Sequence, residues 1–227
     1  MVRKTKQDAL ETRNGLLDAA ERVFCERGVS RASLGDIAAA AGATRGAIYW
    51  HFKDKVDLFN AMMDRVTLPL EHAFNAFDGR GDVEPVVRVR AALLYVFRVV
   101  STDERTRRVF DVALNKVEYV ADLWGVRDRH IAATDAFVNQ LERDLRLAFE
   151  CQGVHTSVSP RDAAVGLHCL FDGLLREWIL KGGGFDLVRV GVVTLDAYLR
   201  GLGLRWAASV GDVRLPDELP CDNARLS

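Results

Sequence analysis

The sequence lacks any long apolar stretch. No segment approaches the roughly 18 consecutive apolar residues that a membrane-spanning helix needs. The basic opening MVRKTKQDALETR is not followed by the apolar core of a secretory signal. Only five of the 227 residues are prolines, and neither a low-complexity segment nor an internal repeat is present. We therefore expect an ordinary folded protein of the cytoplasm with no membrane partner.

The sequence also lacks paired cysteines. Four cysteines lie far apart and form neither a CxxC pair nor a Cys/His spacing typical of zinc sites: Cys25, Cys151, Cys169 and Cys221. We expect isolated thiols that pack as small apolar side chains, and a thiol redox switch stays open as the alternative. No nucleophile is paired with a base, and KGGGFD lacks the spacing of a phosphate-binding loop. We thus expect no metal, no cofactor and no catalytic residue.

An excess of charge of one sign is missing as well. The chain has 31 Lys and Arg against 32 Asp and Glu, a net charge of −1. The distribution is uneven, because residues 1–55 contain ten basic and seven acidic residues, and the remainder contains 21 and 25. The first seven residues include Arg3, Lys4 and Lys6 but no acid. A basic end on an otherwise acidic chain is a weak indication of a surface that faces nucleic acid.

Apolar residues recur at helical spacing nearly everywhere, without the alternation typical of strands. The sequence therefore predicts an all-α fold. A first helix spans about residues 8–27 and ends at Gly28, and two short helices begin after the capping residues Ser33 and Thr44. Asp54 caps a fourth helix.

The chain beyond residue 54 has the pattern of a larger helical body. Pro69 lies inside the fourth helix, where we expect a kink near residues 65–68. A glycine-rich break at residues 78–82 precedes Pro85, which suits the first turn of a helix. The predicted helices that follow span about residues 85–100, 103–119, 122–151, 160–181 and 186–207.

Residues 33–55, SLGDIAAAAGATRGAIYWHFKDK, have the pattern of a helix-turn-helix unit. Ala38 is small where the two helices must approach closely, and Gly42 permits the left-handed turn between them. Ile37 and Ile48 supply the apolar contacts that hold the two helices together. This element places its second helix in the major groove of duplex DNA.

The second helix of this unit carries side chains suited to DNA. Arg45 lies in its first turn, where arginine commonly reads guanine, and Gly46 lets the backbone approach. We predict these DNA-contacting residues: Ser33, Thr44, Arg45, Gly46, Tyr49, Trp50, His51 and Lys55. The alternative is a helical subdomain whose aromatic residues merely pack, but so short a helix cannot bury them all.

Residues 12–55 resemble the TetR family of one-component regulators, and the segment GATRGAIYWHFKDK is highly specific for that family. The phrase TRGAIYWHF is especially similar to the TetR-type repressors of multidrug efflux operons. The resemblance implies an all-helical homodimer with two N-terminal reading heads and C-terminal effector-binding bodies. The implied partners are double-stranded operator DNA and a small hydrophobic or cationic effector.

Two later stretches, ERTRRVFDVALNK (104–116) and FDGLLREW (171–178), also resemble the efflux regulators. The resemblance implies an effector pocket that includes Phe110, Leu114, His168 and Asp172. Asp172 shares a mostly apolar helix face with His168, and a carboxylate there suits a cationic or hydrogen-bonding ligand. An ion pair between Asp172 and Arg176 is the alternative.

The last two long helices, 160–181 and 186–207, have more apolar surface than one side needs. We expect them to form the dimer interface, with burial inside the monomer as the alternative. The sequence thus predicts a helix-turn-helix DNA-binding domain at residues 1–53, an effector-binding and dimerisation domain at 54–208 and a flexible tail at 209–227.

The favoured hypothesis is a dimeric repressor of a multidrug efflux operon that its effector releases from DNA. A second hypothesis is a TetR-type regulator of another pathway, such as an activator or a sensor of fatty-acyl or signalling molecules. A third is a helical binding protein without a role at DNA.

Overall fold

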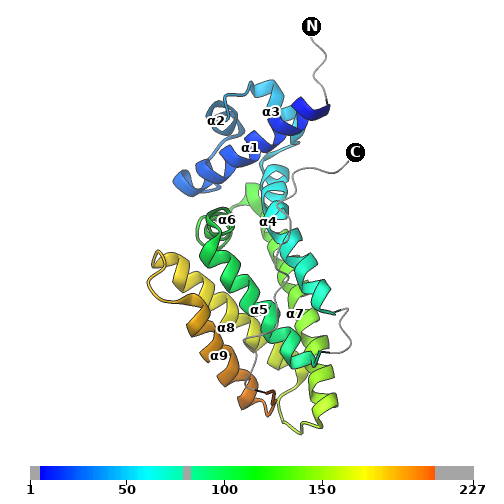
Figure 1. The fold of residues 1–227 in the computed structure, drawn as a ribbon. Helices are drawn as coiled ribbons and strands as arrows, with labels where there is room; N and C mark the ends of the chain where they lie inside the picture. The colour runs from blue at the N-terminus through cyan, green and yellow to red at the C-terminus, as the bar shows by residue number, and fades with distance from the viewer. Residues whose placement is uncertain (1–5, 79–82, 208–227) are drawn as a thin grey trace. The chain divides into compact units, whose positions relative to one another are not determined.

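Helices make up all the regular structure of the described chain. The computed structural model describes residues 6–78 and 83–207, and no strand occurs in these ranges (Figure 1). The helices are α1 Lys6–Arg27, α2 Leu34–Ala40, α3 Arg45–His51, α4 Lys55–Asp78, α5 Pro85–Thr102, α6 Glu104–Asn115, the 3₁₀ turn η1 Ala121–Leu123, α7 Trp124–Gln152, α8 Pro160–Leu180 and α9 Leu187–Gly201. The predicted all-α fold is confirmed. The predicted tail, the basic residues Arg3 and Lys4, and Cys221 lie outside the described residues.

These helices form two compact units. The first unit contains Met1–Val66 with Asp103–Thr134, and the second contains Thr67–Thr102 with Asp135–Ser227. Helices α4 and α7 therefore contribute to both units. The predicted domain boundary between residues 53 and 54 lies inside the first unit. Whether this boundary separates a DNA-binding region from an effector-binding region stays a prediction.

Local capping determines where α2 and α3 begin. The Ser33 hydroxyl accepts a hydrogen bond from the Asp36 N–H at 3.1 Å, and the Asp36 carboxylate accepts one from the Ser33 N–H at 3.0 Å. The Thr44 hydroxyl likewise accepts from the Ala47 N–H at 3.1 Å. Gly42 takes a φ of +64° in the turn between the two helices. The predicted caps and turn of the helix-turn-helix unit are confirmed.

In the first unit, α1 packs against α2, α3 and α6. Its side chains Leu16, Leu17 and Phe24 are completely buried, as are Ile37 of α2 and Ile48 of α3. Each such side chain contributes about 1.5–3 kcal/mol relative to exposure. This burial is essential, because helices of seven residues are not stable alone in water.

In the second unit, α9 packs against both α5 and α8. The Phe97 and Phe171 rings, from α5 and α8, stack with their centroids 4.9 Å apart. Gly191 of α9 lies against Phe97, and a Cβ at that position would overlap the ring. Arg90 of α5 forms two hydrogen bonds with the Asp196 carboxylate of α9, the longer at 3.2 Å. α9 is therefore fixed to α5 by close packing and by a paired charge.

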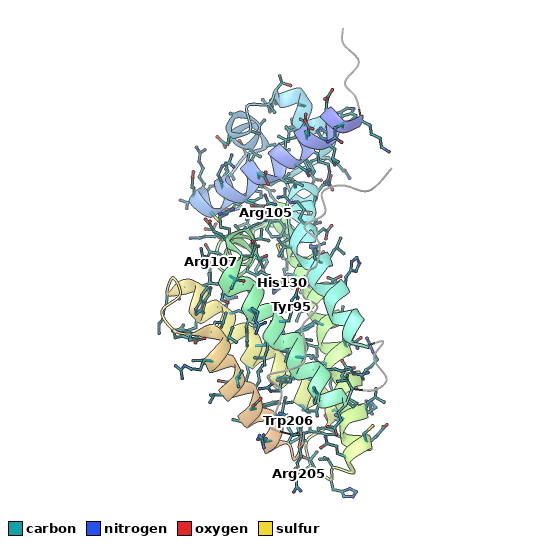
Figure 2. All side chains as sticks on the ribbon, viewed as in Figure 1. Tyr95, Arg105, Arg107, His130, Arg205 and Trp206 are labelled. Atoms are coloured by element: carbon teal, nitrogen blue, oxygen red, sulfur yellow. The ribbon has the colours of Figure 1, made fainter. Side chains whose placement is uncertain are left out.

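After α9 the chain is tied back to the end of α7. The N–H of Arg205 donates to the Gln152 side-chain oxygen at 2.8 Å, and the Gln152 amide donates to the Arg205 carbonyl at 2.6 Å. The Arg200 guanidinium lies over the Trp206 ring, 4.5 Å from its centroid. Figure 2 labels Arg205 and Trp206 at this end of the second unit.

The helix expected over residues 103–119 ends early, at Asn115, so the predicted end was wrong. The carbonyl of Lys116 instead accepts the Val29 N–H at 3.0 Å. This partner is far away in the sequence, so helical periodicity alone gave no sign of it. The chain resumes helical structure at η1.

The helix expected over residues 186–207 is also shorter and ends at Gly201. Gly203 takes a φ of +90°, which breaks the helical path immediately after the end of α9. Pro69 lies within α4, which continues through it. The kink that we expected there stays a prediction.

Candidate nucleic-acid interface

The two faces of α3 differ in burial. Ile48 is completely buried and Phe52, which caps the helix end, is 2% exposed. On the opposite face Arg45 is exposed, Tyr49 is 51% exposed and Trp50 is 73% exposed. Large aromatic side chains at the surface indicate a binding surface when they gather with a cation. Five of the predicted DNA-contacting residues are exposed here: Thr44, Arg45, Gly46, Tyr49 and Trp50.

Two further predicted residues are partly engaged within the unit. The Ser33 hydroxyl donates to the Asp36 carboxylate at 2.6 Å in addition to accepting at the helix cap. The His51 ring lies edge-on to the Trp50 indole, with the two centroids 4.5 Å apart. By contrast, the Thr44 hydroxyl uses an oxygen lone pair for its cap, which leaves its hydrogen available to a phosphate. Contacts of Ser33, Thr44 and His51 with DNA stay predictions.

Lys55 has a contact that the sequence did not reveal. Its ammonium donates to the carbonyl of Ser30 at 2.8 Å and to that of Ala32 at 3.1 Å. Burial lowers the pKa of Lys55, and the Asp122 carboxylate opposes that shift. Two of the three N–H donors of this ammonium are therefore committed to the loop between α1 and α2.

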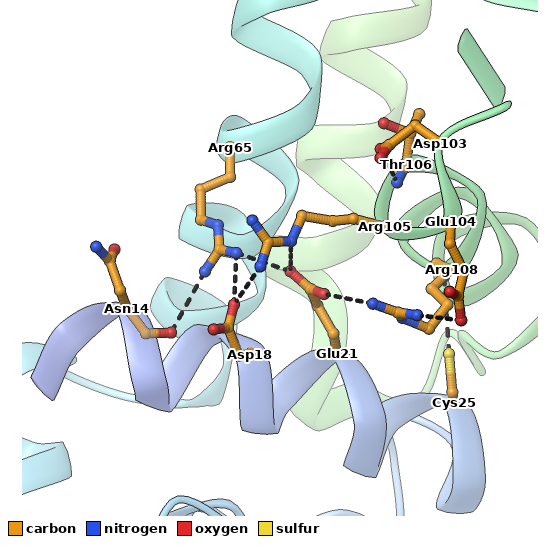
Figure 3. A network of polar contacts seen from close by, with 10 residues as sticks. All are labelled: Asn14, Asp18, Glu21, Cys25, Arg65, Asp103, Glu104, Arg105, Thr106 and Arg108. Atoms are coloured by element: carbon orange, nitrogen blue, oxygen red, sulfur yellow. Dashed lines mark hydrogen bonds and ion pairs between the residues drawn. The ribbon is translucent and has the colours of Figure 1, made fainter. Parts of the chain in front are cut away.

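A network of five charged residues joins three helices of the first unit (Figure 3). Asp18 and Glu21 extend from α1, Arg65 from α4, and Arg105 and Arg108 from α6. Arg65 Nη2 lies 2.6 Å from Asp18 Oδ1 and 3.2 Å from Glu21 Oε1. The network connects α1, which supports the helix-turn-helix unit, to α4 and α6.

Glu21 is the buried centre of this network. Its side chain is only 2% exposed, and Arg105 Nε and Arg108 Nη2 lie 3.6 Å and 3.8 Å from its carboxylate oxygens. Burial raises the pKa of Glu21, whereas Arg65, Arg105 and Arg108 each act to lower it. A buried carboxylate is tolerated only where cations surround it, as they do here.

Cys25 is poorly suited to a redox switch. Its thiol donates to the Arg108 carbonyl at 3.7 Å. Burial and, next, the Asp111 carboxylate raise the pKa of this thiol from 9.0 to about 11. At pH 8 the thiolate fraction should be roughly 100-fold below that of an unperturbed thiol.

We therefore expect an alkylating reagent at pH 8 to label Cys25 about 100-fold more slowly than the exposed Cys151. Mass spectrometry of a labelling time course measures both rates. Unfolding in urea should bring the Cys25 rate up to that of Cys151. Equal rates in the folded protein would contradict this.

The four predicted effector residues divide between the two units. Phe110 and Leu114 lie on α6 in the first unit, and His168 and Asp172 lie on α8 in the second, all partly buried. Within the second unit, Asp172 Oδ2 lies 4.0 Å from Arg176 Nε, which is the ion pair that the sequence left open.

His168 has an aromatic neighbour in the second unit. Its ring lies edge-on to Phe137, with centroids 5.8 Å apart, and Phe137 in turn contacts Phe171. An effector contact at any of these residues stays a prediction. Among the described residues no group of three His, Cys, Asp or Glu could hold a metal. None of the described helices is long and apolar enough to cross a membrane.

Two family models match the chain. Residues 16–62 match the model "Bacterial regulatory proteins, tetR family", and residues 84–204 match the model of the "MAATS-type transcriptional repressor, C-terminal region". The chain belongs to the TetR family. The first match covers the helix-turn-helix unit, so the family resemblance inferred from GATRGAIYWHFKDK is confirmed.

Similar TetR-family proteins are known in sequence and in structure. The chain is 37% identical over 188 residues to the HTH-type transcriptional regulator TtgR of Pseudomonas putida, covering 83% of this chain and 90% of TtgR. It resembles NalD, the secondary repressor of the MexAB-OprM multidrug efflux pump in Pseudomonas aeruginosa, at 34% identity and a TM-score of 0.78, covering 86% and 98%. The SmeT–triclosan complex matches at 32% identity and a TM-score of 0.78, covering 92% and 99%. SmeT is the repressor of the Stenotrophomonas maltophilia pump SmeDEF.

Proposed function

We propose that this chain is a ligand-responsive transcriptional repressor that controls a multidrug efflux operon. The observation that carries the proposal is the exposed face of α3, where Arg45, Tyr49 and Trp50 lie on the second helix of a helix-turn-helix unit. The repressors NalD and SmeT, both of multidrug efflux pumps, match nearly the whole described chain in fold. Such a regulator acts in the cytoplasm, where the operator DNA is.

The repressor acts as a homodimer through α8 and α9. Three apolar side chains on these helices are exposed in the single chain: Val165, Leu180 and Val193, at 42%, 69% and 61%. Apolar side chains on an unpartnered pair of helices favour association with a second copy. A dimer suits DNA because two α3 helices about 34–36 Å apart can enter successive major grooves.

The effector is a small hydrophobic or cationic compound bound by the helical body. SmeT has been solved with triclosan, a small hydrophobic compound, and this supports the proposal for its relative here. Phe110, Leu114, His168 and Asp172 are the proposed effector contacts. The effector must bind the DNA-free conformation more tightly than the DNA-bound one, since equal affinity would shift nothing.

Binding to DNA upstream of the nearest efflux operon tests this function. We expect the purified protein to retard a duplex from that region, to ignore an unrelated duplex of equal length and to release the DNA on addition of triclosan or a cationic dye. Analytical ultracentrifugation of the complex gives the number of chains bound. Retention of the DNA with every compound would contradict the efflux role, and equal binding to both duplexes would contradict the repressor itself.

A further inference from the structure

Five cations of the first unit already pair with acidic side chains. Arg27 pairs with Asp36 at 2.9 Å, and Arg129 pairs with Asp64 at 2.6 Å. The network around Glu21 uses Arg65, Arg105 and Arg108. Since a paired cation gains less from a phosphate than an unpaired one, these side chains are poor candidates for DNA contacts.

Three cations close to α3 have no acidic partner among the described residues. Arg45 begins the helix, Lys53 follows its capping residue Phe52, and Arg13 reaches Phe52 from α1. The Arg13 guanidinium carbon lies 5.2 Å from the centroid of the Phe52 ring. α1 packs against α3, and this contact places the Arg13 guanidinium beside Phe52 at the C-terminal end of α3.

The stacking of Arg13 on Phe52 leaves its guanidinium able to bind an anion. A guanidinium that lies on an aromatic face is held in place, while its N–H donors remain free in the plane of the group. A phosphate binds in that plane with two parallel hydrogen bonds. Lys53 is exposed, and its backbone N–H is fixed by the Asp57 carboxylate at 3.0 Å, so its position next to α3 is also defined.

We propose that Arg13 and Lys53 contact the phosphates that flank α3 on DNA, and that Lys55 instead serves the fold. Arg13 and Lys53 were not among the residues predicted from the sequence, whereas Lys55 was. Lys55 differs because two backbone carbonyls, of Ser30 and Ala32, take up its ammonium. This assignment rests on the proposed function, since it concerns how the helix-turn-helix unit at residues 33–55 binds DNA.

Salt dependence separates phosphate contacts from other effects. Each phosphate neutralised by the protein releases counterions, so the slope of log K against log[salt] changes by about 0.9 per contact. A dimer loses two contacts per substitution, so each slope should shrink by about 1.8. Because phosphates carry no sequence information, operator and unrelated DNA should lose affinity by the same factor.

The experiment measures binding of the protein to a labelled operator duplex and to an unrelated duplex by fluorescence anisotropy. The salt concentration is varied from about 50 to about 300 mM, a range over which such slopes are measurable. Arg13→Gln and Lys53→Gln should each reduce the slope and leave the preference for the operator unchanged. Lys55→Gln should keep the wild-type slope and lower the melting temperature. Arg146→Gln removes the same charge from an exposed site in the second unit and serves as the control.

Arg13→Lys guards against a loss of folding at this position, because it keeps the charge and loses the planar stack. It should retain the wild-type slope. A wild-type slope for Arg13→Gln or Lys53→Gln, or a reduced slope for Lys55→Gln, would overturn the assignment. If wild-type protein does not prefer the operator at all, the proposed function itself fails, and this outcome is distinct from an unchanged slope.

Discussion

Replacing Arg45 with alanine should weaken operator binding by about 5- to 150-fold for each reading head, which corresponds to about 1–3 kcal/mol. Arg45 is the first residue of α3, is exposed, and forms no ion pair within the described chain. A guanidinium in this position can form two hydrogen bonds with a guanine edge. Titration of a labelled operator and of an unrelated duplex measures the effect, and the preference for the operator should fall with the affinity.

The control for this substitution is Arg107→Ala. Arg107 is an exposed cation of α6 in the same compact unit (Figure 2), so its loss changes the net charge equally. We expect it to retain the operator preference. Were Arg45→Ala to lower binding to operator and unrelated DNA by the same factor, Arg45 would be a phosphate contact and not a base contact.

The features that could be predicted from the sequence are those determined by neighbouring residues. Ser33 and Thr44 cap helices through hydrogen bonds to residues three positions further on. Gly28 and Gly42 mark turns because they take positive φ values of +79° and +64°. The family resemblance adds the face of α3, because GATRGAIYWHFKDK carries both the turn and the reading residues.

Features that depend on distant residues could not be predicted in this way. The carbonyls that hold Lys55 lie 23 and 25 positions earlier in the chain, and no periodic pattern connects them. Glu21 has the appearance of an ordinary polar residue within α1, since only the packing of α4 and α6 buries it. The early end of α6 was missed for the same reason, since the hydrogen bond from the Val29 N–H to the Lys116 carbonyl joins residues far apart in the sequence.

The substitution Glu21→Ala should destabilise the first unit by about 3 kcal/mol. Removal of the buried carboxylate leaves Arg65 with Asp18 and the Asn14 carbonyl, and it takes from the Arg108 guanidinium its ion pair with α1. This loss of stability lies at the lower end of the range for breaking buried ion pairs. The side chains of Arg105 and Arg108 are 46% and 35% exposed, so both can be hydrated by solvent once the carboxylate is gone. Hydrogen exchange measures it, with faster exchange expected in α1 and α6.

The exchange of α9 provides the internal control, since this helix belongs to the second unit and should be unchanged. Asp18→Asn is the matched variant: its carboxylate is 39% exposed and shares Arg65 and Arg105 with Glu21. We expect it to cost about 1 kcal/mol or less, as exposed ion pairs do. Equal effects of the two substitutions would show that burial of Glu21 is unimportant.

A double-mutant cycle between Glu21 and Arg65 distinguishes an ion pair from simple loss of packing. If the carboxylate acts through the Arg65 guanidinium, the two single substitutions to alanine should not add, and the coupling energy should be about 0.5–3 kcal/mol. Additive effects would mean that Glu21 acts mainly by filling space between α1 and α6. Glu21→Gln refines this result, because it keeps the volume and removes the charge. Loss of stability in that variant would therefore assign the effect to the charge on a carboxylate that three arginines surround.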